Sequence, residues 1–471
     1  MTNIKDIIVE DKKAFPILKI AGELGANHKL KVFVVGGFVR DLFLNRKSIE
    51  IDLMVEGDGI KYSQLLADEL GVKKIVPFKE FGTAKIPYPK MEIEVASARV
   101  EDYDLSSRKP KEVKYTDIFG DLKRRDFTIN AMAVDLLPKT FGNLYDPYNG
   151  ITDLKAKQLI TPLNPDETFS EDPLRMMRAA VFASRFNFEI DDICLNSMQK
   201  QASRIQIVSW ERITAELIKI LETDKPSIGL IILQNTGLMK YVFPEIDIMV
   251  GMEQPAEWHH KDIFYHTMQV VDNAAALSDK MELRFAAFVH DIGKPKTRRI
   301  HKAKGFTFYG HDDLGSRMLK SIAKRMKLSN DLRDYLIKMT ILHLRPIALA
   351  KEGVSDSAVR RLMVTAGDET DDLLTLCRAD ITSKNPERVN LYMGNFERVE
   401  KFMQDVVERD KLKAFQSPVR GNEIMRVCGL KEGKQVGQIK SAIEEAILDG
   451  KIENTYEAAF KYLLEIKDDF C

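Results

Sequence analysis

The hydrophobic pattern of this chain changes its period once, and that change divides the fold. Up to about residue 150, short β-branched runs alternate with segments of helical spacing. From Asp166 to about Asp410, apolar residues recur with the period of 3.6 that marks amphipathic helices. The pattern predicts an α+β protein with a mixed N-terminal sheet and an all-helical remainder. The segment SPVRG, residues 417–421, predicts a linker before a small C-terminal module.

Composition narrows the class of protein. The 471 residues include 71 Lys and Arg and 71 Asp and Glu, so the formal net charge is zero, and 44% of the residues are hydrophobic. These values exclude a wholly disordered chain and a protein that is basic all over, but a local basic patch stays compatible with nucleic-acid binding. No run approaches the ~20 apolar residues of a membrane helix, so we expect no membrane partner.

Cysteine usage and the N-terminus indicate the compartment. The four cysteines are far apart and form no CxxC pair: Cys194, Cys377, Cys428 and Cys471. Free thiols of this kind are typical of a reducing cytosol. The first residues have acids where a signal peptide needs apolar residues. We therefore expect a cytoplasmic protein.

A glycine pair and a carboxylate pair lie in the predicted sheet region. Gly36 and Gly37 separate a predicted strand from a predicted helix, where backbone N–H groups can bind an anion or simply make a turn. Glu50 and Asp52 lie two residues apart on the next predicted strand, so both point to one face. Such a pair could bind Mg²⁺, or it could lie harmlessly on a solvent-facing edge strand.

Two further charged groups follow. Arg124, Arg125 and Asp126 suit a triphosphate and a ribose hydroxyl, although a solvated charge cluster is the alternative. The group Asp172, Arg175 and Arg178 has the spacing of one helical face, from which an Asp and an Arg could bind a base edge. The alternative is an intrahelical salt bridge worth only ~0.3–0.5 kcal/mol.

Together, four motifs resemble a known family. VVGGFVRDLFL, IEIDLMVEG, RRDFTINAMA and EDPLRMMRAAVFASRF occur in the order and spacing of bacterial-type CCA-adding tRNA nucleotidyltransferases and the related poly(A) polymerases. The resemblance extends from about residue 15 to 466. It implies addition of CCA to the tRNA 3′ end from CTP and ATP, without a nucleic-acid template, by Mg²⁺-dependent attack of the 3′-hydroxyl on the α-phosphate.

The resemblance also implies roles for single residues. The catalytic Mg²⁺ ligands would be Glu50 and Asp52, and the triphosphate would contact Gly36, Gly37 and Arg40. Ribose and phosphate would contact Arg125, Asp126 and Asn130. The base would pair with Asp172 and Arg175, with Arg178 nearby. One residue departs from the family pattern, because Glu50 stands where the family usually has Asp. The added methylene either shifts the backbone or reduces activity, since Mg²⁺ demands tight octahedral geometry.

The stretch ASARVEDYDLSSRKPKEV, residues 96–113, resembles the flexible loop with which the family switches from CTP to ATP. Its presence favours full CCA addition or addition of A. An ordinary charged surface loop would explain its composition equally well.

Histidines and aspartates recur across the helical region. Six of them are candidate ligands: His266, His290, Asp291, His311, His343 and Asp380. Imidazole and carboxylate ligands suit Mn²⁺, Ni²⁺, Fe or Zn²⁺, and such a centre can hydrolyse a phosphoester. The order resembles the HD-domain phosphohydrolases, whose pattern also includes Lys294. A relic without metal is the alternative.

The two resemblances predict four parts. They are a nucleotidyltransferase head over 1–155, a helical neck and body over 156–255, an HD domain over 256–410 and a C-terminal tail over 411–471. Within the HD part, Lys294–Gly305 has six Lys or Arg and no acid, which predicts either contacts with tRNA phosphates or a solvated basic loop.

Four readings of the activity stay open. The first is CCA addition, with the tRNA 3′ end, CTP and ATP as partners and no obligate protein partner. The second is a poly(A) polymerase or A-adding enzyme. The third makes HD-domain hydrolysis the main activity, and the fourth is an RNA-binding protein with a head disabled at Glu50.

Overall fold

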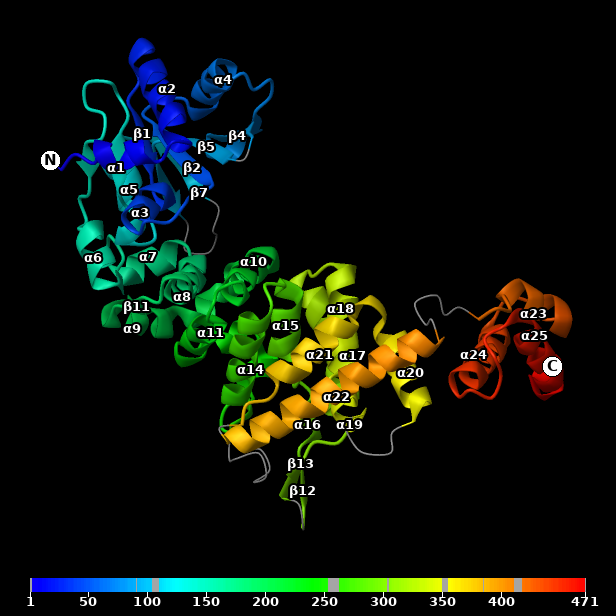
Figure 1. Cartoon of the computed structure of the whole chain (residues 1–471). Helices are drawn as coiled ribbons and strands as arrows, with labels where there is room; N and C mark the ends of the chain where they lie inside the picture. The colour runs from blue at the N-terminus through cyan, green and yellow to red at the C-terminus, as the bar shows by residue number, and fades with distance from the viewer. Residues whose placement is uncertain are drawn as a thin grey trace. The chain divides into compact units, whose positions relative to one another are not determined.

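The computed structural model describes residues 2–89, 91–103, 110–252, 262–302, 305–349, 355–383, 385–410 and 417–470. The chain forms two compact units, Met1–Asp247 and Ile248–Cys471. The expected α+β class is confirmed, because one large sheet lies in the N-terminal part and helices make up nearly all of the rest (Figure 1). Among the described residues, no helix combines the length and apolar content that crossing a bilayer requires.

The first unit is organised around a seven-stranded sheet of order β3-β4-β5-β2-β1-β8-β9. Its strands are β1 (Val32–Val35), β2 (Glu50–Val55), β3 (Val76–Phe78), β4 (Thr83–Tyr88), β5 (Met91–Ser97), β8 (Ala133–Asp135) and β9 (Leu144–Tyr145). The helices of this region are α1 (Lys5–Glu10), α2 (Ala14–Asn27), α3 (Gly37–Phe43), α4 (Gly59–Glu69), α5 (Ile118–Lys123) and α6 (Gly150–Ala156). Strand β2 runs antiparallel to β1 and parallel to β5.

One face of this sheet forms the main core. Ile51, Leu53 and Val55 of β2 are fully buried in a cluster with residues of α2 and α4. Because side chains alternate along a strand, Glu50 and Asp52 point to the opposite face. The burial of the odd-numbered residues therefore decides which face carries the acids.

A hairpin of β6 (Arg99–Tyr103) and β7 (Pro110–Tyr115) follows the sheet. It falls in the stretch predicted to be a flexible loop, of which residues 104–109 lie outside the described chain. The short strands β10 (Gln158–Leu159) and β11 (Glu189–Ile190) pair in parallel near the start of the helical region.

Helices of the first unit follow the head. They are α7 (Pro165–Glu171), α8 (Leu174–Phe186), α9 (Asp192–Gln201), α10 (Trp210–Leu221), α11 (Pro226–Asn235), α12 (Met239–Val242) and α13 (Pro244–Asp247). Helix α8 packs against α10 and α11. The prediction that Asp172 shares a helical face with Arg175 and Arg178 is wrong. Asp172 has φ −135° and ψ 96°, between α7 and α8, because Pro173 disfavours the helical conformation of the residue before it.

The second unit is almost entirely helical. Its larger helices are α14 (Ile263–Leu277), α15 (Met281–Val289), α17 (His311–Met326), α18 (Asn330–Leu342), α20 (Asp356–Ala366), α21 (Thr370–Ala379) and α22 (Pro386–Asp410), with the short α16 (Lys294–Thr297) and α19 (Arg345–Leu349) between them. Helix α14 packs on α15 and α21, and α17 packs on α18. Where only a loop was expected, β12 (Arg299–His301) and β13 (Gly305–Thr307) form an antiparallel hairpin.

The C-terminal helices are α23 (Gly421–Cys428), α24 (Lys434–Leu448) and α25 (Tyr456–Phe470). They enclose a small core of their own, in which Ile424, Ile439, Ile443 and Leu463 are fully buried.

Candidate active site and metal centre

The turn from β1 to α3 requires glycine at its first position. Gly36 has φ +69°, and a Cβ built there would lie 2.6 Å from Nη1 of Arg125. Gly37 begins α3 directly afterwards. The glycine pair therefore makes the turn and also lets an arginine approach the backbone closely.

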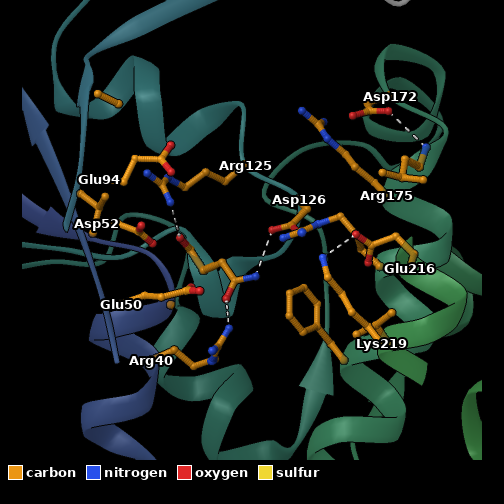
Figure 2. A pocket seen from close by; sticks show the side chains of 18 of the residues that line it. Arg40, Glu50, Asp52, Glu94, Arg125, Asp126, Asp172, Arg175, Glu216 and Lys219 are labelled. Atoms are coloured by element: carbon orange, nitrogen blue, oxygen red, sulfur yellow. Dashed lines mark hydrogen bonds and ion pairs between the residues drawn. The ribbon is translucent and has the colours of Figure 1, made fainter. Parts of the chain in front are cut away.

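Three carboxylates gather on the face of the sheet opposite the main core. The parallel register places Asp52 of β2 directly opposite Glu94 of β5, and Glu50 lies two residues before Asp52 on the same face (Figure 2). Burial, with smaller contributions from the charges of Glu94 and Glu50, raises the pKa of Asp52 to about 6, although the charge of Arg125 opposes this rise. A cation between these acids would relieve their repulsion. Glu94 was missed in the sequence, although the alternation in MEIEVAS placed it on one strand face.

A buried acid fixes two arginines beside the carboxylates. Asp121 is fully buried, and its two oxygens lie 2.5 Å from Nη2 of Arg124 and 2.9 Å from Nη2 of Arg125. Burial alone would raise the pKa of Asp121, but the two guanidinium groups hold it below its usual value. Asp121 was also missed, although the i, i+3 and i+4 spacing from it to the arginines was a usable signal.

Four of the predicted residues form one hydrogen-bonded chain. Nη1 of Arg40 donates to Oδ1 of Asn130 at 2.7 Å, and Nδ2 of Asn130 donates to Oδ1 of Asp126 at 3.0 Å. The other oxygen of Asp126 lies 2.6 Å from Nη2 of Arg178. The chain connects α3 of the head with α8 and so holds a guanidinium at each end in a fixed place (Figure 2).

Asp172 and Arg175 are each held by new partners. Nη2 of Arg212, on α10, lies 3.4 Å from Oδ2 of Asp172. Nη2 of Arg175 donates to the Arg124 carbonyl oxygen at 2.6 Å, and its Nη1 donates to the Thr168 carbonyl oxygen at 3.2 Å. The two predicted base-binding residues therefore meet at the junction of α7 and α8 without an ion pair between them in the described chain.

Glu216 adds an acid that the sequence analysis did not select. It is buried one turn after Arg212 on α10, and Lys219 lies 2.8 Å from its Oε1. Its Oε2 has no hydrogen-bond partner in the described part of the chain. The i, i+4 spacing of Arg212 and Glu216 was the available signal, but only the packing of α10 against α8 brings them to the site.

Most of these groups border one cavity of about 910 Å³ within the first unit. The residues predicted for the head and neck line it, apart from Gly36, and so do Glu94, Arg212, Glu216 and Lys219. On the sheet side of the cavity Arg40 and Arg125 lie beside the three carboxylates, and on the helical side acids and cations also alternate (Figure 2). This distribution of charge suits a polyphosphate whose own charge is balanced by divalent cations.

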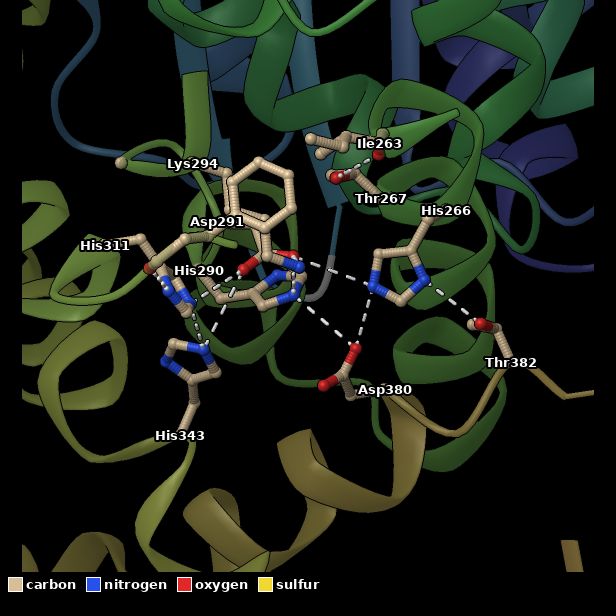
Figure 3. Close-up of polar contacts among 12 residues, drawn as sticks. Ile263, His266, Thr267, His290, Asp291, Lys294, His311, His343, Asp380 and Thr382 are labelled. Carbon is tan, nitrogen blue, oxygen red and sulfur yellow. Dashed lines mark hydrogen bonds and ion pairs between the residues drawn. The ribbon is translucent and has the colours of Figure 1, made fainter. Parts of the chain in front are cut away.

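The six histidine and aspartate candidates of the second unit converge on one point (Figure 3). They form two groups whose ligand atoms lie within 4.8 Å of one another: His266, His290 and Asp380, and Asp291, His311 and His343. Nε2 of His290 lies 3.1 Å from Oδ2 of Asp291, while Nε2 of His311 lies 3.2 Å from Oδ1 of Asp291. Asp291 therefore lies between the two groups.

Each imidazole is oriented through its other nitrogen. Nδ1 of His290, His311 and His343 lies 2.7–2.8 Å from a backbone carbonyl oxygen, and Nδ1 of His266 lies 3.0 Å from Oγ1 of Thr382. A carbonyl oxygen only accepts, so these three Nδ1 atoms donate and their Nε2 atoms face the centre. This is the usual arrangement of metal-binding histidines.

The charges at this centre also fit a metal. Burial alone would raise the pKa of Asp291. The neighbouring His290 and Lys294 lower it more strongly, so the pKa of Asp291 lies well below its usual range. Burial, with the neighbouring His290, lowers the pKa of His343 to about 4, so His343 is neutral at neutral pH. Nε2 of His290, both oxygens of Asp291 and Oδ1 of Asp380 are buried and form no well-oriented hydrogen bond in the described chain. Buried polar atoms whose contacts are ion pairs without well-oriented hydrogen bonds are expected of metal ligands.

The mixed sheet with its acids and the six-ligand helical centre define a class, a nucleotidyltransferase fused to an HD domain. Three family models match the chain: "Poly A polymerase head domain" over 32–160, "Probable RNA and SrmB-binding site of polymerase A" over 187–249, and "HD domain" over 263–385.

A relative described as "Multifunctional CCA protein", from Shewanella frigidimarina, is 33% identical over 323 residues, which cover 67% of this chain and 74% of the relative. The chain therefore belongs to the family of CCA-adding tRNA nucleotidyltransferases and poly(A) polymerases, as the motifs indicated, and it is a nucleotidyltransferase.

Solved structures support the fold. A Bacillus stearothermophilus CCA-adding enzyme in complex with CTP is 21% identical, with a TM-score of 0.68 and coverage of 97% of this chain and 98% of that one. A Thermotoga maritima CCA-adding enzyme in complex with tRNA is 22% identical, with a TM-score of 0.59 and 99% of each chain covered.

Proposed function

We propose that this protein adds CCA to the 3′ end of tRNA from CTP and ATP, without a nucleic-acid template. The observation that carries the proposal is the cavity in which Glu50, Asp52 and Glu94 face a set of fixed arginines. The relative described as a multifunctional CCA protein supports the choice of substrate. The proposal divides the chain into a head over 1–155, a neck and body over 156–255, an HD domain over 256–410 and a tail over 411–471.

The residues of the head would divide the work of phosphoryl transfer. Asp52, Glu50 and Glu94 would hold Mg²⁺, which when bound neutralises charge on the triphosphate. The Gly36–Gly37 turn, Arg40 and Arg125 would bind the triphosphate oxygens. The tRNA 3′-hydroxyl then attacks the α-phosphate and pyrophosphate leaves, so the protein contributes mainly position and charge.

Nucleotide choice is assigned to the neck. The Asp172 carboxylate accepts a hydrogen bond from the amino group that cytosine and adenine share, and Arg175 donates to the adjacent ring nitrogen. The ion pair between Arg212 and Asp172 supports this assignment, because it orients the carboxylate. Asp126 and Asn130, joined to Arg178, contact the ribose side of the nucleotide.

The experiment is an end-sequencing assay. Transcripts of a tRNA that ends at the discriminator base and of one that ends in CC are incubated with the protein, Mg²⁺, CTP and ATP, and the 3′ ends are sequenced. Ends that stop at CCA on both transcripts support the proposal. Addition of A to the CC-ended transcript alone indicates an A-adding enzyme, and long A tails indicate a poly(A) polymerase.

Glu50 provides the control. Absence of incorporation, restored by Glu50→Asp, would mean that the departure at this position has reduced the head's activity. Absence of incorporation that Glu50→Asp does not restore would overturn the proposal.

A second activity is favoured by the HD centre. We propose that its six ligands hold a transition metal such as Mn²⁺, Ni²⁺, Fe or Zn²⁺, and that the centre hydrolyses phosphoesters. The inward Nε2 atoms and the buried carboxylate oxygens without well-oriented hydrogen bonds support this proposal. Metal analysis after loading with Ni²⁺ or Mn²⁺ tests it. Less than about a tenth of an equivalent would count against the centre, since such sites bind these metals tightly.

A further inference from the structure

A basic segment joins two ligands of the HD centre. Between Asp291 and His311 the chain has no Asp or Glu, but it has Lys294, Lys296, Arg298, Arg299, Lys302 and Lys304. We call the described residues 296–302 and 305–308 the basic arm. The arm begins five residues after Asp291 and ends three residues before His311, so both of its ends connect directly to proposed metal ligands.

The strands β12 and β13 of the arm pair in an antiparallel hairpin that projects from the helices of the second unit (Figure 1). Ile300 pairs with Phe306 in the antiparallel register, and Arg299 pairs with Thr307. The guanidinium carbon of Arg298 lies 3.8 Å from the centroid of the Phe306 ring. These contacts fix the arm without using its outer charges.

The outer charges face solvent. Lys296, Arg299 and Lys302 are exposed, and none of them forms an ion pair with a carboxylate in the described part of the chain. Tyr309, which follows the arm, is 73% exposed. Unpaired cations beside an exposed aromatic ring are suited to a single nucleic-acid strand, whose phosphates and bases they can contact together.

Lys294 connects the arm with the centre. Its Nζ lies 2.6 Å from Oδ2 of Asp291 and 5.8 Å from the centroid of the Phe308 ring, at the base of the arm. A bilayer is a poorer fit than RNA, because Ile300 is the one large apolar side chain exposed on the described part of the hairpin.

We propose that the basic arm binds the backbone of an RNA strand and delivers a terminal phosphate of that strand to the HD centre. The substrate class rests on the hydrolase activity proposed above, whereas the RNA contact does not. Hydrolysis would join a water oxygen to phosphorus and break the bond from phosphorus to the ribose oxygen. That oxygen takes up a proton, so the products are a hydroxyl end and inorganic phosphate.

The test compares three full-length proteins. They are the wild type, the arm variant Lys296→Gln/Arg299→Gln/Lys302→Gln, and a matched control, Lys320→Gln/Lys324→Gln/Lys434→Gln, which removes three exposed charges elsewhere in the second unit. Anisotropy measures binding of a 5′-labelled RNA of about 12 nucleotides with a 3′-phosphate, over a range of salt concentrations. Binding by the head is common to all three proteins, and equal metal content verifies that the HD centre is intact.

We expect the arm variant to bind this RNA about tenfold more weakly than the control, with a salt slope shallower by about 2. An arm variant that matches the control in both quantities would overturn the proposal. The proposal would also be overturned if the arm variant lost binding to phosphatidylserine vesicles but kept its binding to RNA.

Release of phosphate from the RNA and from p-nitrophenyl phosphate is measured in parallel. The delivery step is supported if the arm variant no longer releases phosphate from RNA but still releases it from p-nitrophenyl phosphate. Absence of both reactions in the metal-loaded wild type overturns the hydrolase activity and the delivery step, while the binding result still judges the RNA contact.

Discussion

The two candidate sites differ in how completely the folded chain prepares them. In the HD centre, six ligands lie in two groups with ligand atoms within 4.8 Å, and second contacts orient all four imidazoles. In the head, Glu50, Asp52 and Glu94 share a sheet face but form no such group among the described residues. This difference supports the proposal that the HD centre holds a resident ion, whereas the head acids suit an ion that arrives with its nucleotide.

The largest effect is expected from Asp52→Asn. Loss of this carboxylate removes the most buried of the proposed Mg²⁺ ligands, so nucleotide incorporation should fall by about a thousandfold. The measurement is single-turnover incorporation of CTP. Glu92→Gln is the matched control, because Glu92 lies on the same strand face as Glu94 but does not line the cavity. Equal losses of incorporation in the two variants would contradict the role of Asp52. A change in the metal content of the HD centre would contradict the independence of the two sites.

Asp291→Asn should impair the HD centre without affecting the head. Asp291 lies between both ligand groups, so its loss should weaken Ni²⁺ or Mn²⁺ binding by about a hundredfold or more and leave CTP incorporation unchanged. Titration of the metal-free protein measures the affinity. The control is Asp313→Asn, an exposed acid on α17. A parallel loss of incorporation would indicate that the two sites act as one.

Acid should weaken Mg²⁺ binding by the head. The folded pKa of Asp52, about 6, lies above the unfolded value of about 3.9, so the folded carboxyl holds its proton more tightly and Mg²⁺ must displace it. Because the folded pKa is the higher of the two, ionisation of Asp52 lowers the stability of the metal-free fold as pH rises from about 4 to about 6. Between pH 7 and pH 5 the apparent Mg²⁺ affinity should fall about tenfold. An affinity that is constant over this range would mean that Asp52 does not bind Mg²⁺.

The smallest effect is expected from Arg212→Gln. The ion pair between Arg212 and Asp172 is partly buried and orients the Asp172 carboxylate. Its loss should reduce discrimination between CTP and UTP about fivefold, which corresponds to about 1 kcal/mol of binding free energy. The ratio of kcat/KM for the two nucleotides measures this. Glu211→Gln, an exposed neighbour on α10, is the control. A uniform loss for both nucleotides would indicate a purely structural role for Arg212.

Sequence reasoning reached the fold class from local periodicity, and the resemblance of four motifs to a family indicated many, but not all, of the residues that line the sites. Period 2 and period 3.6 located the sheet and the helices, and the motif order indicated the family. It failed at Asp172, which the spacing placed on one helical face with Arg175 and Arg178, because Pro173 disfavours the helical conformation of the residue before it. It also missed the hairpin of the basic arm, because a run of basic residues has no hydrophobic period to reveal a strand.

The sequence by itself determined which residue types are present and which of them share a strand or a helix. The tertiary structure decided which distant residues meet. The parallel pairing of β2 with β5 brings Glu94 to Asp52, and the packing of α10 on α8 brings Arg212 and Glu216 to the cavity. In the HD centre, ligands from positions 266 to 380 converge. Such meetings depend on how the apolar faces of whole elements bury one another, and no local pattern encodes that choice.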